Sequence, residues 1–148
     1  MDAYRAQVAT AHKACTLRLY AALRELGLAV PEPKGAFYVY PSFHPYTKQL
    51  EALGIRTSKQ LSRWLIEEFG VAALPGSVFG EEDVGVAGGR LRLRMATSYL
   101  YFKDQGERYV RGYELLSQSG TGSGELRLEL LDEAVEAIGR AVARLKAQ

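Results

Sequence analysis

The sequence predicts an α+β fold in two layers, with a small, largely antiparallel sheet and helices packed on one face. Residues 2–26 and 125–147 carry apolar side chains at steps of three and four, the spacing of amphipathic helices. Residues 36–40 are aromatic and β-branched, and residues 90–97 alternate cationic with apolar side chains, which are two patterns typical of strands. The order of elements (helix, strand, helix, short strand, strand, long insert, helix) is typical of a two-layer domain whose sheet keeps one face free.

Length and composition indicate one globular domain over residues 1–148. Hydrophobic residues make up 47% of the chain, enough for a substantial core. The formal net charge of +2 is too small to indicate a nucleic acid or a membrane surface as partner. Cys15 is the single cysteine, so an internal disulfide is excluded and a cytoplasmic setting is expected. We expect neither a signal peptide nor a membrane span.

A second helix is expected over residues 57–69. Thr57 and Gln60 fit a capping box, in which the hydroxyl and the side-chain amide each bind a backbone N–H at the start of the helix. Gly70 is expected to end this helix, because glycine adopts the left-handed conformation of a C-terminal cap. A short apolar strand over residues 71–74 and a Pro-Gly turn are expected next.

The alternating stretch places Arg90, Arg92 and Arg94 in a row on one face of its strand, with Tyr38 and Tyr40 expected on the same face. The residues between the arginines are expected to face the core: Leu91, Leu93 and Met95. Alternate arginines stand about 7 Å apart, where two unit charges repel by about 0.6 kcal/mol in water. The row therefore indicates an anion, either an acidic side chain, a phosphate or a carboxylate ligand, unless the face is simply solvated.

The segment between this strand and the last helix has a mixed pattern. Residues 99–118 have the apolar content of a helix, with interruptions expected at Gly106 and Gly112. Residues 117–124 are rich in Ser, Gly and Thr and are expected to form a flexible loop. We expect an insert at about residues 101–124, between this strand and the last helix.

Three segments carry motifs that stand out together. They are PKGAFYVYP at residues 33–41, VAALPGSVFG at residues 71–80 and LRLRMATS at residues 91–98. In this order and approximate spacing they resemble the P-x-G-A-F-Y strand, the gV-x-x-x-PG-x-x-F-G segment and the h-R-h-s-h-A strand of pyridoxal-phosphate-dependent aminotransferases of fold type I, class I and II. The resemblance covers residues 1–99 and the final helix.

The resemblance implies that the chain is the C-terminal small domain of such an enzyme, whose sheet faces the cleft between cofactor and substrate. The arginine of the h-R-h-s-h-A strand maps onto Arg92 and would bind the substrate α-carboxylate. A guanidinium suits this role because it is always charged and presents a planar fork to both carboxylate oxygens. Arg94 departs from the family, which commonly has a small or polar residue there.

The resemblance also implies the cofactor pyridoxal 5′-phosphate, bound as a Schiff base to a lysine of the large domain. No matching Ser-x-x-Lys motif is found here, and Lys59, which follows Thr57-Ser58, is expected to be a surface residue of a capped helix. The chain is therefore expected to be inactive alone. In the complete enzyme it would pair with the large PLP-binding domain, in a homodimer, and transfer an amino group between an L-amino acid and a 2-oxo acid.

Two alternatives remain open on the sequence. The same domain occurs in pyridoxal-phosphate lyases of the aminocyclopropane-carboxylate synthase type, which would share Arg92. The chain could instead be a non-catalytic regulatory or interaction domain, with the aromatic residues between 99 and 113 as its partner surface. His12 and His44 have no neighbouring cluster of metal ligands in the sequence, so no metal site is expected.

Overall fold

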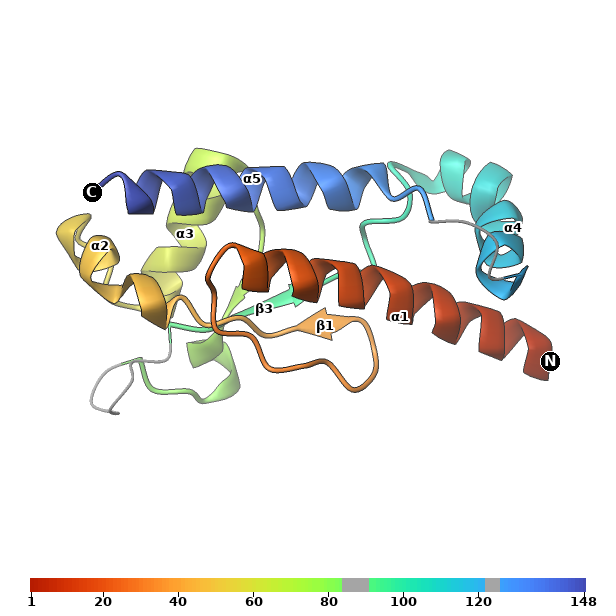
Figure 1. Cartoon of the computed structure of the whole chain (residues 1–148), viewed down its shortest axis with the longest axis horizontal. Helices are drawn as coiled ribbons and strands as arrows, with labels where there is room; N and C mark the ends of the chain where they lie inside the picture. Colours follow the sequence, from red (N-terminus) through yellow and green to blue (C-terminus); the bar gives the residue numbers. More distant parts are fainter. Residues whose placement is uncertain (84–90, 122–125) are drawn as a thin grey trace.

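The computed structural model describes residues 1–83, 91–121 and 126–148, and of residues 119–121 the backbone alone. Arg90 therefore lies outside the described residues. The described chain is an α+β domain, as predicted, with helices and a three-stranded sheet (Figure 1). The elements in chain order are α1 (Asp2–Glu25), β1 (Tyr38–Val39), the 3₁₀ helix η1 (His44–Tyr46), α2 (Thr47–Ala52), α3 (Ser58–Phe69), β2 (Leu74–Pro75), the 3₁₀ helix η2 (Gly76–Phe79), β3 (Leu93–Ala96), α4 (Gln105–Thr121) and α5 (Glu129–Lys146).

The sheet is antiparallel, with β3 in the centre and the order β1-β3-β2. Tyr38 pairs with Ala96 on one side of β3, and Leu74 pairs with Arg94 on the other. An isolated bridge between Ser42 and Arg92 continues the pairing toward the start of β3. The alternating stretch is thus the central strand, and every other element of the sheet is positioned by it.

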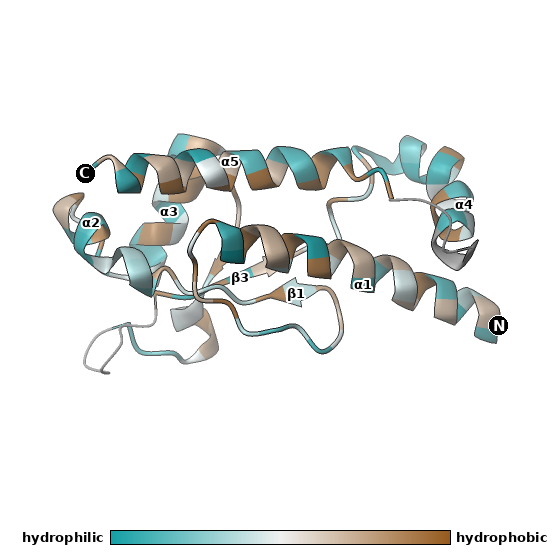
Figure 2. Ribbon diagram, in the orientation of Figure 1, coloured by the Kyte–Doolittle hydropathy of each residue, from teal (hydrophilic) through white to brown (hydrophobic). Residues whose placement is uncertain are grey.

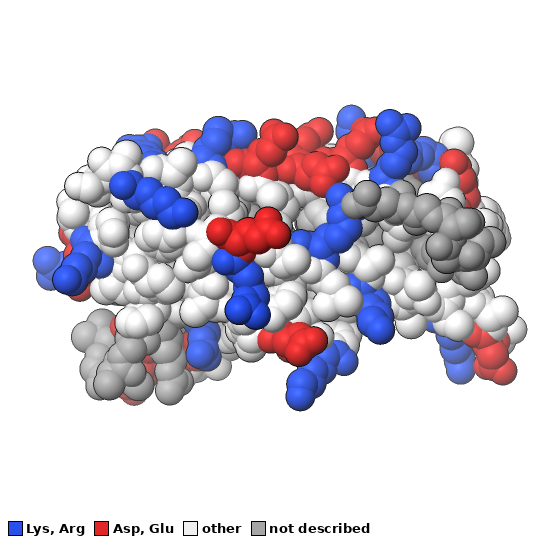
Figure 3. Space-filling view, in the orientation of Figure 1, with Lys and Arg blue, Asp and Glu red and all other residues white. Residues whose placement is uncertain are grey.

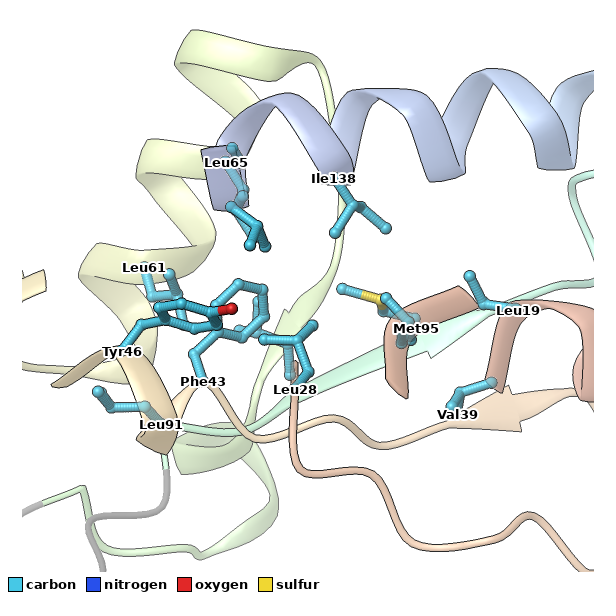
Figure 4. Close-up of a cluster of buried hydrophobic side chains, with 14 of the residues drawn as sticks. Leu19, Leu28, Val39, Phe43, Tyr46, Leu61, Leu65, Leu91, Met95 and Ile138 are labelled. Carbon is cyan, nitrogen blue, oxygen red and sulfur yellow. The ribbon is translucent and has the colours of Figure 1, made fainter. Parts of the chain in front are cut away.

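The helices cover one face of this sheet. In Figure 1, α1 and α5 run in the same direction, with α5 above the strands. Both helices contribute buried side chains, and apolar colour marks the side of α5 that faces the sheet in Figure 2. The core between the layers takes side chains from α1, α3, α5 and the sheet. Among them are the residues labelled in Figure 4: Leu19, Leu28, Val39, Phe43, Tyr46, Leu61, Leu65, Leu91, Met95 and Ile138.

The helix ends follow the local signals of the sequence. The predicted capping box of α3 is present, since Thr57 accepts from the backbone N–H of Gln60 and the Gln60 side chain accepts from that of Thr57. Gly70 ends α3 with φ of 70°. Gly27 ends α1 with φ of 87°, and a Cβ there would lie 2.7 Å from Tyr46 Oη, so this position requires glycine twice over.

The predicted strands are shorter in the structure. The first was expected over residues 36–40, but Ala36 has φ of 58° and belongs to the turn that precedes β1. The strand expected over residues 71–74 begins at Leu74 and ends at Pro75, which leads into η2. These short edges fit a sheet whose central strand alone is paired on both sides.

The prediction of a flexible loop from residue 117 is wrong as far as residue 121, because α4 continues to Thr121 and passes through Gly112 without a break. The Ser117 hydroxyl donates to the carbonyl of Tyr113 at 2.8 Å, which satisfies it inside the helix. The remaining residues of the expected loop, 122–124, lie outside the described part. Helix α4 packs against α1 at the N-terminal end of that helix (Figure 1). Tertiary packing can stabilise a helix whose own propensity is low.

No helix in the described residues is long and apolar enough to cross a membrane. On the face shown in Figure 3, basic and acidic side chains are interspersed, with acidic residues gathered along the upper edge where α5 runs.

Candidate functional site

The two faces of β3 differ as the alternating sequence predicts. Leu91, Leu93 and Met95 are buried, at 3%, 0% and 5% exposure. Arg92 and Arg94 point to the opposite face, away from the core, and are partly exposed. Arginine side chains on the free face of a sheet are available to a ligand or to another part of a larger protein.

Arg92 is held by an acidic side chain that follows η2. Its Nη1 donates to Glu81 Oε1 at 3.0 Å, and its guanidinium carbon lies 5.7 Å from the centre of the Tyr40 ring. The side chain of Arg92 is 36% exposed, whereas that of Glu81 is 17% exposed. In this row, Arg92 is paired with the acidic side chain of Glu81, which is one of the kinds of anion that the sequence indicates. We call Arg92, Glu81 and Tyr40 the arginine cluster.

Gly76 allows this cluster to form. Its backbone N–H donates to the Arg92 carbonyl at 2.8 Å, and its own carbonyl accepts from the Glu81 N–H at 3.3 Å. A Cβ on Gly76 would lie 2.8 Å from Glu81 Oε2, 2.9 Å from Tyr40 Oη and 3.1 Å from the Arg92 carbonyl oxygen. The glycine of the Pro-Gly turn is thus needed for the close approach of these groups, in addition to its role in the turn.

The hydrogen bonding of the cluster is incomplete. Arg92 Nε and Glu81 Oε2 are both buried and have no hydrogen-bond partner in the described part of the chain. Burial raises the pKa of the Tyr40 phenol, and the adjacent Glu81 carboxylate raises it further. Tyr40 is therefore a neutral neighbour of a charged pair, and the Arg92 guanidinium keeps donor capacity that Glu81 does not use.

Arg94 has a different environment. Its guanidinium lies 4.5 Å from the centre of the Tyr38 ring and 4.4 Å from that of Phe79, so it is held between two aromatic rings. Tyr38 and Tyr40 therefore share the arginine face, as predicted. Tyr38, Leu74 and Phe79 are 37%, 46% and 45% exposed, and they give this face an apolar surface beside the charges.

The segment that carries Glu81 is anchored to the start of α3. Ser58 Oγ lies 3.0 Å from Asp83 Oδ2 and 3.2 Å from Ser77 Oγ, and it accepts from the Ser77 N–H at 3.3 Å. Sequence reasoning missed both this anchor and the role of Glu81. The available signal was the acidic pair that directly follows Phe79-Gly80, in the segment leading to the arginine strand.

The other candidate residues lie elsewhere. His12 Nδ1 is 2.9 Å from Tyr101 Oη, in a contact between α1 and the segment after β3, and His44 is exposed. The described residues contain no group of histidines, cysteines or carboxylates that could hold a metal ion. Lys59 is exposed, as predicted, and so are the chain's other lysines: Lys13, Lys34, Lys48, Lys103 and Lys146.

Comparison with known proteins identifies the family of this chain. Residues 1–99 match the family model described as aminotransferase class I and II. The chain belongs to the class I and II aminotransferase family. This is the family that the three motifs resemble, and the matched residues hold the whole arginine cluster.

Individual relatives agree with the family model. The chain is 38% identical over 77 residues to an aspartate aminotransferase of Pyrococcus abyssi, a match that covers 52% of this chain and 17% of that protein. It is 40% identical over 93 residues to a probable aspartate/prephenate aminotransferase of Aquifex aeolicus, covering 63% and 19% of the two chains. The chain therefore spans about a fifth of the length of the curated relatives it matches.

Among solved structures, the chain resembles an aromatic aminotransferase from Pyrococcus horikoshii, with a TM-score of 0.57 and 25% identity. This similarity covers 93% of the present chain and 26% of the archaeal one. It extends beyond residue 99, where the family match ends, so part of the C-terminal region shares the fold as well.

Aminotransferases of this family generally use pyridoxal phosphate. The residues of this chain do not fit that group by themselves, because every lysine is exposed and none belongs to the arginine cluster. A Schiff-base lysine needs a partly enclosed site that lowers its pKa. What the described residues do provide is a positioned arginine, whose guanidinium can bind a carboxylate.

Proposed function

We propose that this chain is the C-terminal small domain of a PLP-dependent aminotransferase and that Arg92 binds the α-carboxylate of the substrate. The reaction of the complete enzyme would be amino-group transfer between an L-amino acid and a 2-oxo acid. The lysine that binds the cofactor would belong to the large domain, so the chain is inactive alone. We also propose that the complete enzyme contains a large domain, assembles as a homodimer and acts in the cytoplasm.

The observation that carries the proposal is the state of Arg92. The resemblance of residues 91–96 to the h-R-h-s-h-A strand supports Arg92 as the carboxylate-binding arginine. Arg92 lies on the free face of the central strand, and its Nε is buried with no acceptor in the described chain. A buried donor without an acceptor is costly, by about 1–3 kcal/mol. A bidentate carboxylate supplies acceptors in a fixed plane, and so orients the substrate Cα as well as binding it.

The apolar residues on the arginine face support the presence of a further domain. Tyr38, Leu74 and Phe79 are each more than a third exposed, although they belong to or adjoin a sheet. Large apolar side chains beside a charged site are typical of a surface that another domain covers. The large domain is the occupant that the family implies.

The proposal extends to the domain organisation. We propose that residues 1–148 form one small domain with an insert at about 101–124, most of which is α4. The end of the family match at residue 99 supports this division. Helix α5 packs on α1 and α3, so it belongs to the core that the matched residues build.

The function is tested in the complete enzyme with Arg92→Lys. Lysine keeps the positive charge but loses the planar fork, so we expect KM for the amino acid to rise at least about tenfold with cofactor binding unchanged. Arg144→Lys on α5 is the matched control, since Arg144 also pairs with a glutamate, Glu68, at 2.6 Å. Equal KM values for the two variants would remove Arg92 from the substrate site.

The absence of the cofactor lysine is tested by adding pyridoxal phosphate to the purified chain. A Schiff base absorbs in the visible range, and addition of an amino acid shifts that absorbance. We expect no saturable band from the chain alone. A saturable band that responds to an amino acid would show that one of its lysines performs the chemistry, and the proposed division between two domains would be wrong.

A further inference from the structure

We propose that Glu81 is a resident carboxylate on Arg92 which an incoming substrate carboxylate displaces, so that Glu81 sets the carboxylate affinity of the site. The inference rests on the proposed function of Arg92 and adds a specificity-determining residue to it. The chemistry is a competition between two carboxylates for one guanidinium. Glu81 is covalently part of the chain, so it competes at a fixed and high local concentration.

The geometry shows that the resident pair can be exchanged. Glu81 and Arg92 share one hydrogen bond, from Nη1 to Oε1 at 3.0 Å, whereas an arginine and a carboxylate can form two parallel bonds. The unused atoms on both sides, Arg92 Nε and Glu81 Oε2, are buried and have no hydrogen-bond partner among the residues that the structure describes. A substrate carboxylate that binds the guanidinium through both oxygens makes the contact that Glu81 leaves incomplete.

The contact is nevertheless built into the local backbone. Gly76 binds the Arg92 carbonyl through its N–H and the Glu81 N–H through its carbonyl, which brings the two residues together. A side chain at Gly76 would collide with Glu81 Oε2. The adjacent Glu82 is exposed, so of these two acidic residues the fold selects Glu81 for Arg92.

The segment keeps its place when the pair opens. Ser58 holds both the backbone N–H of Ser77 and the side chain of Asp83, on either side of Glu81 in the sequence. These bonds do not involve Arg92. Glu81 can therefore release the guanidinium by a change of side-chain conformation while its flanking residues stay anchored to α3.

The test is a titration of the ¹⁵N-labelled chain with pyruvate, the smallest 2-oxo acid, followed by NMR shifts of the Arg92 side chain and of β3. Methyl pyruvate, which lacks the carboxylate, is the ligand control. Glu81→Gln removes the competing charge, and Glu81→Asp keeps the charge but shortens its reach. We expect both variants to bind pyruvate up to about fivefold more tightly than the natural chain, because loss of a partly exposed ion pair is worth up to about 1 kcal/mol.

Glu82→Gln is the matched control, since it removes the same charge one residue away and should change the affinity less than twofold. Equal affinities of Glu81→Gln and Glu82→Gln, or no pyruvate binding by Glu81→Gln, would overturn the proposal. If Glu81→Asp bound pyruvate with the affinity of the natural chain, Glu81 would act only through its local charge. That result would overturn the proposal as well. If Glu81→Gln disturbs the amide spectrum of the fold, Glu81→Asp decides.

Arg92→Lys separates this inference from the proposed function. Suppose that Arg92→Lys loses pyruvate binding while Glu81→Gln and Glu82→Gln bind pyruvate equally well. Arg92 would then remain the carboxylate site, and only the role of Glu81 would be rejected. Unchanged binding in Arg92→Lys would reject both.

Discussion

Two polar clusters lie on opposite sides of the sheet, and their hydrogen bonding differs. The inner cluster joins α1 to the end of β3: Thr16 and Thr97 share a hydrogen bond of 3.2 Å, and Tyr101 Oη lies 2.9 Å from His12 Nδ1. Its neighbour Cys15 is fully buried. The arginine cluster is charged and partly exposed, and two of its buried atoms, Arg92 Nε and Glu81 Oε2, have no hydrogen-bond partner within residues 1–83, 91–121 and 126–148.

Under the proposed function, this difference is one between a structural cluster and a ligand-binding cluster. Buried polar groups that form hydrogen bonds with one another stabilise a single packing, and their removal lowers the free energy of unfolding. A cluster whose bonding is incomplete stabilises the fold less, but it holds donors ready for a ligand. We therefore expect substitutions in the inner cluster to change stability, and substitutions in the arginine cluster to change carboxylate binding.

The largest effect on stability is expected from Thr97→Val. Thr97 is fully buried, and its hydroxyl contacts both the Thr16 hydroxyl and the Phe37 carbonyl at 3.2 Å. Valine keeps the shape but leaves the Thr16 hydroxyl without this partner, which should lower the free energy of unfolding by about 1–2 kcal/mol. Denaturant unfolding measures the loss. Thr10→Val, at an exposed threonine of the same helix as Thr16, should cost less than about 0.5 kcal/mol.

The next effect concerns alkaline pH. Burial raises the pKa of both the Tyr101 phenol and the Cys15 thiol above their ordinary values of 10.0 and 9.0. Both groups stay protonated in the folded chain when the unfolded chain already ionises, so the unfolded state binds fewer protons and stability falls as the pH rises above about 9. Above pH 10 the fall due to Tyr101 should approach about 1.4 kcal/mol per pH unit.

Tyr101→Phe isolates that contribution, because it removes the phenol and retains the ring. The slope of unfolding free energy against pH between 10 and 11 should flatten in this variant, whatever its stability at neutral pH. Tyr99→Phe, at a tyrosine that is 84% exposed, is the control and should keep the slope of the natural chain. An unchanged slope in Tyr101→Phe would mean that Tyr101 is not part of a buried neutral cluster.

Arg94 shares features with both clusters. It is on the arginine face, like Arg92, yet its guanidinium is held between two aromatic rings. Arg94→Met keeps an apolar stem and removes the cation, so it should cost about 0.5–1 kcal/mol of stability through the contacts with Tyr38 and Phe79. Arg127→Met, at an exposed arginine outside the sheet, is the control. A loss no greater than that of the control would show that the stacking is too weak to order this face.

Much of this comparison could be predicted from the sequence. The alternation of residues 90–97 predicts which side chains enter the core and which stand on the free face, because a strand has a period of two. The family motifs point to Arg92 specifically. Local signals also predict the start and end of α3, where Thr57 and Gly70 have the expected conformations.

The rest depends on tertiary contacts that no local pattern encodes. Helix α4 runs through Gly112 and continues to Thr121, and it packs against α1, a tertiary contact that local propensity does not encode. Cys15 and Tyr101 are far apart in sequence and meet in the inner cluster. Glu81 lies in a polar segment where any acidic residue could have been solvated, and the close approach at Gly76 selects it for Arg92.

The smallest effect on stability, and the sharpest test of the comparison, is expected from Glu81→Gln. The Arg92 side chain is 36% exposed and shares one hydrogen bond with Glu81, so the pair should contribute no more than about 0.5–1 kcal/mol to folding. Glutamine fills the same volume and can still accept from Nη1, which reduces the loss further. The free energy of unfolding, measured beside that of Thr97→Val, should therefore fall by clearly less. A loss as large as that of Thr97→Val would show that the arginine cluster is a structural element as well, and that its unpaired atoms do not indicate a site held ready for a ligand.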